Sequence, residues 1–269
     1  MKGNAMAEEL LQERFDGVLL LTMNRPEVLN ALGTEMMWQM VEALQRAALD
    51  PEIGCVVLTG AGRGFSAGGD MKARASGAKP PPVTPEAGAD ELLGRMECSR
   101  LLHEMPKPTL AMWNGVAAGA GMSLALACDM RIAGESARMT TAFANMGFSG
   151  DFGGHYFLAR LVGPAKAREL YFTSAKLGSA ELEKLGLVNR LVPDAQLREE
   201  TLALARQLGQ GPRVAWRYMK RNMKVAEEGT LAEALQAEAF GMMRCRETED
   251  HKEALRAFTE KRPPVFRGR

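Results

Sequence analysis

The chain has 269 residues, of which 46% are hydrophobic and 25% charged, a composition typical of a folded globular protein and not of a disordered or fibrous one. Its 34 basic and 33 acidic residues leave a formal net charge of +1 without a long basic run, which argues against a nucleic-acid partner. No stretch approaches the roughly 20 apolar residues of a membrane span, and residues 1–9 lack the apolar core of a signal peptide, so we expect a soluble, cytoplasmic protein.

Strand and helix patterns alternate through the first half of the chain. Residues 18–23 and 56–59 are short apolar runs closed by turn residues, and both predict β-strands. Between them, residues 34–49 place apolar side chains at helical spacing. The order strand, helix, strand favours an α/β fold.

The same alternation continues beyond residue 100. Residues 109–116 predict a strand, which is followed by a glycine-rich turn at 119–121. Residues 122–128 then predict an apolar helix, and residues 130–133 another strand. Repeated units of this kind predict ligand sites at the strand ends.

Two further segments differ from this core pattern. From residue 194 the pattern is almost entirely helical, so we divide the chain into a core at 1–193 and a helical region at 194–269. Residues 79–90 carry four prolines and few large apolar side chains, which predicts a mobile loop. Such a loop is either a lid over a substrate or a plain solvated excursion, and the pattern does not separate the two.

Cysteine and histidine are too scattered to predict a metal site. The four cysteines form no CxxC pair, so we expect buried free thiols in a reducing compartment: Cys55, Cys98, Cys128 and Cys245. The histidines do not cluster either: His103, His155 and His251. A structural zinc site has little support in this distribution.

The glycines after the strand at 56–59 first suggest a dinucleotide site, because tight glycines after a strand present N–H groups to a pyrophosphate. However, Phe65 stands where the full spacing needs glycine. A short-chain dehydrogenase also needs a tyrosine with a lysine four residues later, and here the residues at that distance are different: Arg160 after Tyr156, Ala175 after Tyr171 and Asn222 after Tyr218. An oxidoreductase is therefore disfavoured.

The same glycine segment continues as residues 65–72, FSAGGDMK, and residues 114–121 read NGVAAGAG. With these segments the chain resembles the crotonase (enoyl-CoA hydratase/isomerase) superfamily nearly from end to end. Other segments that match in order are Asn24-Arg25-Pro26, Asn30-Ala31-Leu32, Cys128-Asp129, Arg131-Ile132-Ala133, Gly186-Leu187-Val188 with Val192, and Phe258 with Lys261-Arg262-Pro263. The resemblance implies a spiral of ββα units, with a C-terminal helical region that forms trimers, often a dimer of trimers.

The resemblance also implies how an acyl-CoA thioester is bound. The backbone N–H groups of Gly69 and Ala120 would form an oxyanion hole that stabilises a thioester enolate. Ala120 stands where the family usually has glycine, but a backbone donor survives this change if φ stays negative. Residues implied to contact CoA are Ala67, Lys72, and Phe258 with Lys261 from a neighbouring subunit. For the two lysines, a solvated surface charge is the alternative interpretation.

The proton-transfer groups decide the reaction. At the two positions where hydratases of the family carry glutamates, this chain has Ser123 and Phe143. Neither is a carboxylate, although Ser123 could position a water or a substrate hydroxyl. Addition of water by two carboxylates is therefore disfavoured.

One acid remains, Asp151 in residues 147–154, GFSGDFGG. This motif resembles that of superfamily isomerases of the phenylacetyl-CoA ring pathway, which carry an aspartate before paired glycines. Against apolar walls its carboxyl would have a raised pKa and could move a proton from one carbon to another. Alternatively, Asp151 caps a helix that begins near Gly153. His155 is a weaker candidate and fits the face of that helix.

We therefore expect an acyl-CoA enzyme that isomerises the double bond of an enoyl-CoA or a ring-derived thioester. Hydration of an enoyl-CoA is the near alternative, and a catalytically silent CoA-thioester-binding protein is an alternative of another class. No metal, nicotinamide or flavin is needed, since CoA enters as part of the substrate. The acyl group does not follow from the sequence.

Overall fold

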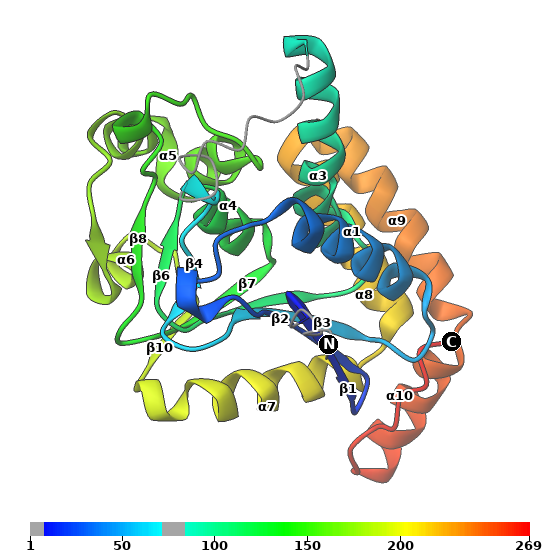
Figure 1. The fold of residues 1–269 in the computed structure, drawn as a ribbon. Coiled ribbons are helices and arrows are strands. Elements are labelled where there is room, and N and C mark those ends of the chain that lie inside the picture. The colour runs from blue at the N-terminus through cyan, green and yellow to red at the C-terminus, as the bar shows by residue number, and fades with distance from the viewer. Residues whose placement is uncertain (1–7, 72–83) are drawn as a thin grey trace.

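A computed structural model describes residues 8–71 and 84–269 of the chain, and two β-sheets organise this part (Figure 1). The larger sheet has the strand order β1-β2-β3-β5-β7-β10, in which only β1 is antiparallel to its neighbour. Its strands are β1 (Leu10–Phe15), β2 (Val18–Met23), β3 (Cys55–Gly60), β5 (Thr109–Trp113), β7 (Met130–Gly134) and β10 (Arg190–Val192). The smaller sheet, in order, has β4 (Gly64–Ser66), β6 (Val116–Ala118), β8 (Arg138–Thr140) and β9 (Leu177–Gly178).

Helices follow the strand pairs in a repeating order. The pairs β3-β4, β5-β6 and β7-β8 each place one strand in the larger sheet and the next in the smaller sheet, and a helix follows each pair. These helices are α3 (Pro85–Glu104), α4 (Ala120–Ala127) and α5 (Gly154–Thr173), while α1 (Thr34–Leu49) precedes them and α6 (Ser179–Lys184) follows. This repetition confirms the predicted α/β fold with a ββα spiral.

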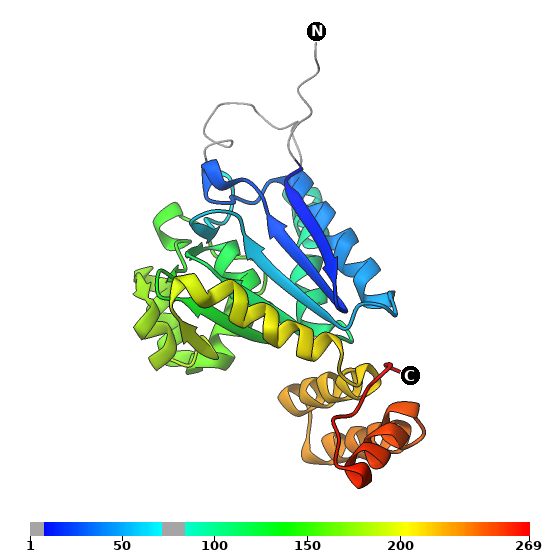
Figure 2. The same ribbon diagram turned by 90° about the horizontal axis from the view of Figure 1, so that it is seen from below.

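The larger sheet is covered on both faces, and this explains why its central strands read as continuous apolar runs. Along β2, Leu19 and Leu21 face the core formed with α1, α3 and α4, while Val18 and Leu20 face the opposite side. There α7 (Leu197–Gly209) lies across the sheet (Figure 2) and contributes Leu197 and Ala205 to the second core. The boundary at 193/194 remains a prediction, and α7 packs on the core.

The predicted strand at residues 109–116 is wrong in extent, because the chain turns at Asn114 and Gly115 and β6 joins the other sheet. The Asn114 amide Nδ2 donates to the carbonyl oxygens of Gly60 (2.7 Å) and Gly62 (2.9 Å), which ties the turn to the end of β3. A side chain at Gly115 would collide with the backbone of Arg63. Two short strands in two sheets therefore replace one longer strand.

The predicted loop at residues 79–90 is wrong for its described part, because α3 begins at Pro85. The Thr84 hydroxyl accepts a hydrogen bond from the Ala87 N–H (3.2 Å), and proline suits the first helical position because its missing N–H has no partner there. Residues 79–83 lie outside the described residues. Their assignment as a lid or a solvated excursion stays a prediction.

We call residues 213–269 the C-terminal lobe; it contains α8 (Arg213–Glu228), α9 (Leu231–Arg246) and α10 (Glu249–Glu260). Figure 2 shows these helices projecting from the core. Helix α8 has no buried residue, but Lys220 anchors it: its ammonium lies 2.8 Å from the Asp129 carboxylate and donates to the carbonyl oxygens of Leu102 and Lys107.

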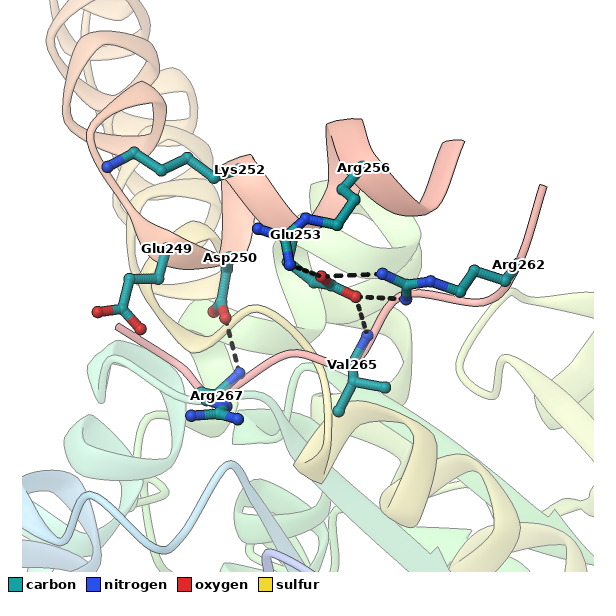
Figure 3. Close-up of a pocket in the computed structure, with 8 residues that line it drawn as sticks. All are labelled: Glu249, Asp250, Lys252, Glu253, Arg256, Arg262, Val265 and Arg267. Atoms are coloured by element: carbon teal, nitrogen blue, oxygen red, sulfur yellow. Dashed lines mark hydrogen bonds and ion pairs between the residues drawn. The ribbon is translucent and has the colours of Figure 1, made fainter. Parts of the chain in front are cut away.

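The end of the chain folds back on α10 (Figure 3). The Glu253 carboxylate accepts from the Arg262 guanidinium (2.6 Å) and from the Val265 N–H (3.1 Å). The buried Asp250 carboxylate accepts from the N–H groups of Arg267 (2.7 Å) and Gly268 (2.8 Å). Two carboxylates on one helix thus hold the C-terminal tail.

The cysteines are free thiols, as predicted, and three of them are buried while Cys245 is partly exposed. Burial raises the pKa of the Cys128 thiol to about 12, so it stays protonated at neutral pH. Across the described residues, no helix combines the length and the apolarity that crossing a bilayer requires.

Candidate active site

A cavity of about 350 Å³ lies where the predicted catalytic residues meet. Its walls come from the turn after β4, the start of α4, one face of α3, and the segment between β8 and α5. The described lining residues are Ala67, Gly69, Met71, Gly88, Leu92, Arg95, Gly119, Ala120, Ala142, Phe143, Met146, Phe148, Ser149, Gly150 and Asp151.

Gly69 and Ala120, 51 positions apart in the sequence, line this cavity from neighbouring backbone segments. A Cβ atom on Gly68 would lie 2.5 Å from the carbonyl oxygen of Ala118 and 3.4 Å from the nitrogen of Ala120, and φ of Gly68 is +82°. Glycine at 68 is thus what permits the two segments to approach. Among the described residues, no internal acceptor is bonded to the N–H of Gly69 or Ala120.

Ala120 is the first residue of α4, where an N–H group has no partner within the helix and the helix dipole favours negative charge. The preceding Gly119 takes the positive φ (+52°), and Ala120 is not among the positive-φ residues. The condition for alanine to replace glycine here is therefore met.

The N-terminal residues 25–32 support the segment that contains Gly69. The Asn30 amide donates to the carbonyl oxygens of Ala61 (2.9 Å) and Gly64 (2.7 Å), and Leu32 pairs with Gly69 in an isolated β-bridge. The Arg25 guanidinium lies 2.8 Å from the Asp70 carboxylate. Residues 25–32 thus hold the turn that presents the Gly69 N–H.

Asp151 lies in a tightly wound segment of the cavity wall. The residues on either side have positive φ, +116° at Gly150 and +52° at Phe152, and the latter is a strained value for an aromatic residue. The backbone carbonyl of Asp151 accepts from the Ser123 hydroxyl (3.0 Å) and from the Gly154 N–H (3.2 Å). These contacts fix the backbone from which the carboxyl group projects.

The alternative interpretation of Asp151 as a helix cap does not match the start of α5. The N-cap position is Gly153, which has no side chain, and no side-chain hydrogen bond caps the helix. The Gly154 N–H bonds instead to the backbone of Asp151. The Asp151 side chain lines the cavity and does not cap α5.

Ser123 and Phe143 occupy different places around the cavity. Ser123 is completely buried and is not among the described lining residues. Its hydroxyl donates to the Asp151 carbonyl oxygen (3.0 Å), with the Gly119 carbonyl oxygen as the alternative acceptor at 3.3 Å, so it supports the wall. Phe143 forms part of the wall itself.

An aromatic stack backs this wall. The rings of Phe143 and Tyr171 are parallel within 4°, with their centroids 6.0 Å apart. The His155 ring also stacks on Tyr171, with a centroid distance of 3.8 Å. Burial raises the pKa of the Tyr171 phenol, and the Asp151 carboxylate raises it further. His155 thus contributes to a packed stack on the face of α5, and it is not among the described lining residues.

The residues expected to bind CoA are dispersed. Ala67 lines the cavity, whereas Lys72 lies outside the described residues. Phe258 is 84% exposed on α10, and Lys261 follows the same helix with φ of +55°. Both belong to the C-terminal lobe, and neither is among the described residues that line the cavity of their own chain.

The sequence interpretation missed one wall, which α3 supplies through Gly88, Leu92 and Arg95. Their spacing of four and three residues places them on one helix face. The signal for this helix was Thr84 followed by Pro85, a helix-start pattern that the run of prolines concealed.

The spiral of ββα units, with a cavity between its strand ends and α3, is the architecture of crotonase-type enzymes, a family that acts on acyl-CoA thioesters. The chain belongs to the enoyl-CoA hydratase/isomerase family, whose sequence model matches residues 13–269. A similar curated protein is the 1,2-epoxyphenylacetyl-CoA isomerase of Escherichia coli K12, 36% identical over 264 residues, which are 98% of this chain and 100% of that protein.

Solved structures of the same family share this architecture. The enoyl-CoA hydratase of Bacillus anthracis superposes with a TM-score of 0.90 at 29% identity, over 97% of this chain and 100% of that one. An enoyl-CoA hydratase of Polaromonas sp. JS666 superposes with a TM-score of 0.88 at 33% identity, over 96% of this chain and 99% of that one. The relatives thus include both isomerase and hydratase names.

Proposed function

We propose that this enzyme shifts the double bond of an enoyl-CoA or of a ring-derived CoA thioester. One observation carries the proposal: among the described residues that line the cavity, Asp151 is the only carboxylate. A single carboxylate suffices to remove a proton at one carbon and return it at another, whereas the family's water addition uses two.

The mechanism uses the two N–H groups and Asp151 in turn. The thioester oxygen of a 3-enoyl-CoA accepts hydrogen bonds from Gly69 and Ala120, and the Asp151 carboxylate removes a proton from the α carbon. The C–H electrons move into a dienolate whose negative charge rests on the thioester oxygen. The protonated Asp151 then returns the proton to the γ carbon, which gives the 2-enoyl thioester and the starting carboxylate.

Hydration is the second candidate, since similar solved structures carry hydratase names. It would require Asp151 alone to activate the water and to transfer the α proton, because Phe143 is apolar and the Ser123 hydroxyl donates to the Asp151 backbone carbonyl. A catalytically silent thioester-binding protein would keep the cavity without using Asp151.

The assembly and location form part of the same proposal. Exposed apolar side chains on one face of α9, Leu231, Leu235 and Met242, suit contact with further copies of the chain as a trimer or a dimer of trimers. In that assembly Phe258 and Lys261 would reach a neighbour's CoA. Buried free thiols fit a reducing, cytoplasmic setting, and the mechanism requires no metal, nicotinamide or flavin.

The test replaces Asp151 by asparagine, which keeps the shape and removes the base. With 2-enoyl, 3-enoyl and ring-derived thioesters in deuterated water, wild-type enzyme is expected to move the double bond without adding water. Deuterium enters the γ carbon only in those turnovers in which the Asp151 carboxyl exchanges its proton with solvent before returning it. Asp151→Asn is expected to lower kcat at least about 10²-fold, while acyl-CoA affinity is unchanged.

Each alternative gives a different result in the same assay. A 3-hydroxyacyl product from a 2-enoyl thioester identifies the hydratase, and binding without turnover or exchange in the wild type identifies the silent protein. Equal kcat in Asp151→Asn and wild type removes Asp151 from the mechanism.

A further inference from the structure

Arg95 is a cationic side chain in the wall of a largely apolar cavity. It lies one helical turn beyond Leu92 on α3, and its side chain is 19% exposed. Besides Asp151, it is the only charged residue among the described residues that line the cavity. The double-bond shift proposed above does not use it.

The guanidinium of Arg95 is poorly satisfied within the protein. Its Nε is buried without a hydrogen-bond partner among the described residues. Glu91 approaches this nitrogen only to 3.8 Å, beyond hydrogen-bond distance, and the Thr34 hydroxyl lies 3.5 Å from Nη1. A buried charged donor left in this state costs free energy unless an acceptor reaches it.

A neighbouring arginine on the same helix shows the contrast. Arg100 is bonded to two glutamates, with 2.8 Å from Nε to Glu97 and 2.7 Å from Nη1 to Glu104. Its side chain is 53% exposed. Helix α3 therefore fully pairs the arginine that faces solvent and leaves the one at the cavity short of acceptors.

From this arrangement we infer that Arg95 determines acyl-group specificity, by donating hydrogen bonds to an oxygen acceptor carried on the acyl chain. The inference rests on the proposed function for the orientation of the thioester at Gly69 and Ala120. The substrate class is then an acyl-CoA whose acyl group bears an oxygen beyond the reacting carbons. A carboxylate is the strongest case, because it pairs with guanidinium through two parallel bonds.

The experiment measures binding of saturated thioesters, which cannot isomerise. Affinities are compared by calorimetry for pairs of equal length with four to eight acyl carbons, one member ending in a methyl group and the other in a carboxylate. For at least one length, wild-type enzyme is expected to prefer the carboxylate by about 10- to 100-fold. Because both members carry the same CoA, the ratio reports the acyl group alone.

Arg95→Met removes the donors and keeps an unbranched side chain, so the preference is expected to fall to near one while affinity for the methyl-ended thioester is kept. Arg100→Met is the matched control and retains the wild-type ratio, and Arg95→Lys retains part of it. The inference is overturned if wild type shows no preference at any length, or if Arg95→Met keeps it.

The same measurement in Asp151→Asn separates this inference from the proposed function. If wild type and Asp151→Asn both prefer the carboxylate-ended thioester but neither isomerises any substrate, Arg95 remains the acyl determinant. The proton shuttle by Asp151 is then rejected. Isomerase activity on methyl-ended and carboxylate-ended 3-enoyl thioesters at equal kcat/KM rejects the role of Arg95 and leaves the shuttle in place.

Discussion

The cavity wall and the C-terminal lobe differ in how much of their apolar surface the chain covers by itself. In the cavity wall, Phe143 is 8% exposed and Ala120 3%, while Met146 (49%) and Phe148 (47%) in the same wall are more exposed. In the lobe, Leu231 is 77% exposed and Phe258 84%. One chain therefore buries the residues at the start of α4 by itself, whereas the lobe leaves large apolar side chains exposed, as the proposed assembly requires.

The largest expected effect comes from Gly68, where the turn that precedes Gly69 lies close to Ala118 and Ala120. Gly68→Ala would force a side chain against the Ala118 carbonyl at a φ of +82°, and so would shift the Gly69 N–H relative to Ala120. We expect kcat/KM to fall about 10²- to 10³-fold, the cost of losing one oxyanion donor. Steady-state kinetics measures it, with circular dichroism to follow folding.

Gly69→Ala is the matched control, because a Cβ there meets no atom within 4 Å and the N–H is kept. It is expected to fold normally and to retain far more activity than Gly68→Ala. If the two variants lose activity equally, the close approach at Gly68 is not what aligns the donors.

The second prediction concerns the lobe. Leu235→Asp places a charge on the exposed apolar face of α9 and is expected to weaken self-association at least about tenfold, since burial of one leucine contributes about 1.5–3 kcal/mol. Sedimentation velocity at several concentrations measures the shift toward smaller species.

Leu49→Asp is its control. Leu49 is the last residue of α1, outside the C-terminal lobe, and its side chain is 86% exposed. This variant is expected to sediment like wild type. A Leu235→Asp protein with unchanged sedimentation would show that α9 does not form the contact.

The smallest effect is expected at the C-terminal tail. Glu253→Gln weakens the ion pair to Arg262 and the bond to the Val265 N–H, so hydrogen exchange at Val265 is expected to accelerate by no more than about fivefold, because the pair is a surface one. Glu260→Gln, which also loses a bond to Arg262 but none to Val265, is expected to leave that exchange unchanged.

The ion pair of Glu253 with Arg262 makes the stability of the C-terminal tail depend on pH. Hydrogen bonds from Arg262 and Val265 lower the pKa of Glu253 from 4.5 to about 2. Since the folded pKa is the lower one, the stabilisation is fully present above about pH 4.5 and is lost as the pH falls through 2. The protection factor of Val265, which is the intrinsic exchange rate at each pH divided by the observed rate, is expected to be constant above about pH 5, and a change there would contradict this assignment.

The sequence pattern predicted correctly those helices and strands whose ends are set by residues adjacent in the sequence. Residues 34–49 form α1, and residues 18–23 form β2, because apolar periodicity and end signals act within a single element. The predicted strand at 109–116 failed at Asn114, whose turn is held by carbonyl groups some 50 positions away. Distant contacts of that kind leave no local periodicity.

The sequence by itself determined the family, because ordered motifs with their spacing survive in a single chain. It also predicted roles for Gly69, Ala120 and Asp151, which line one cavity. Only the tertiary structure decided that Asp151 faces the cavity without capping α5, and that α3 brings Arg95 to the same cavity. The physical reason is that the cavity forms where four separate segments converge. The direction in which each side chain points there is set by packing between segments, which spacing along the chain does not specify.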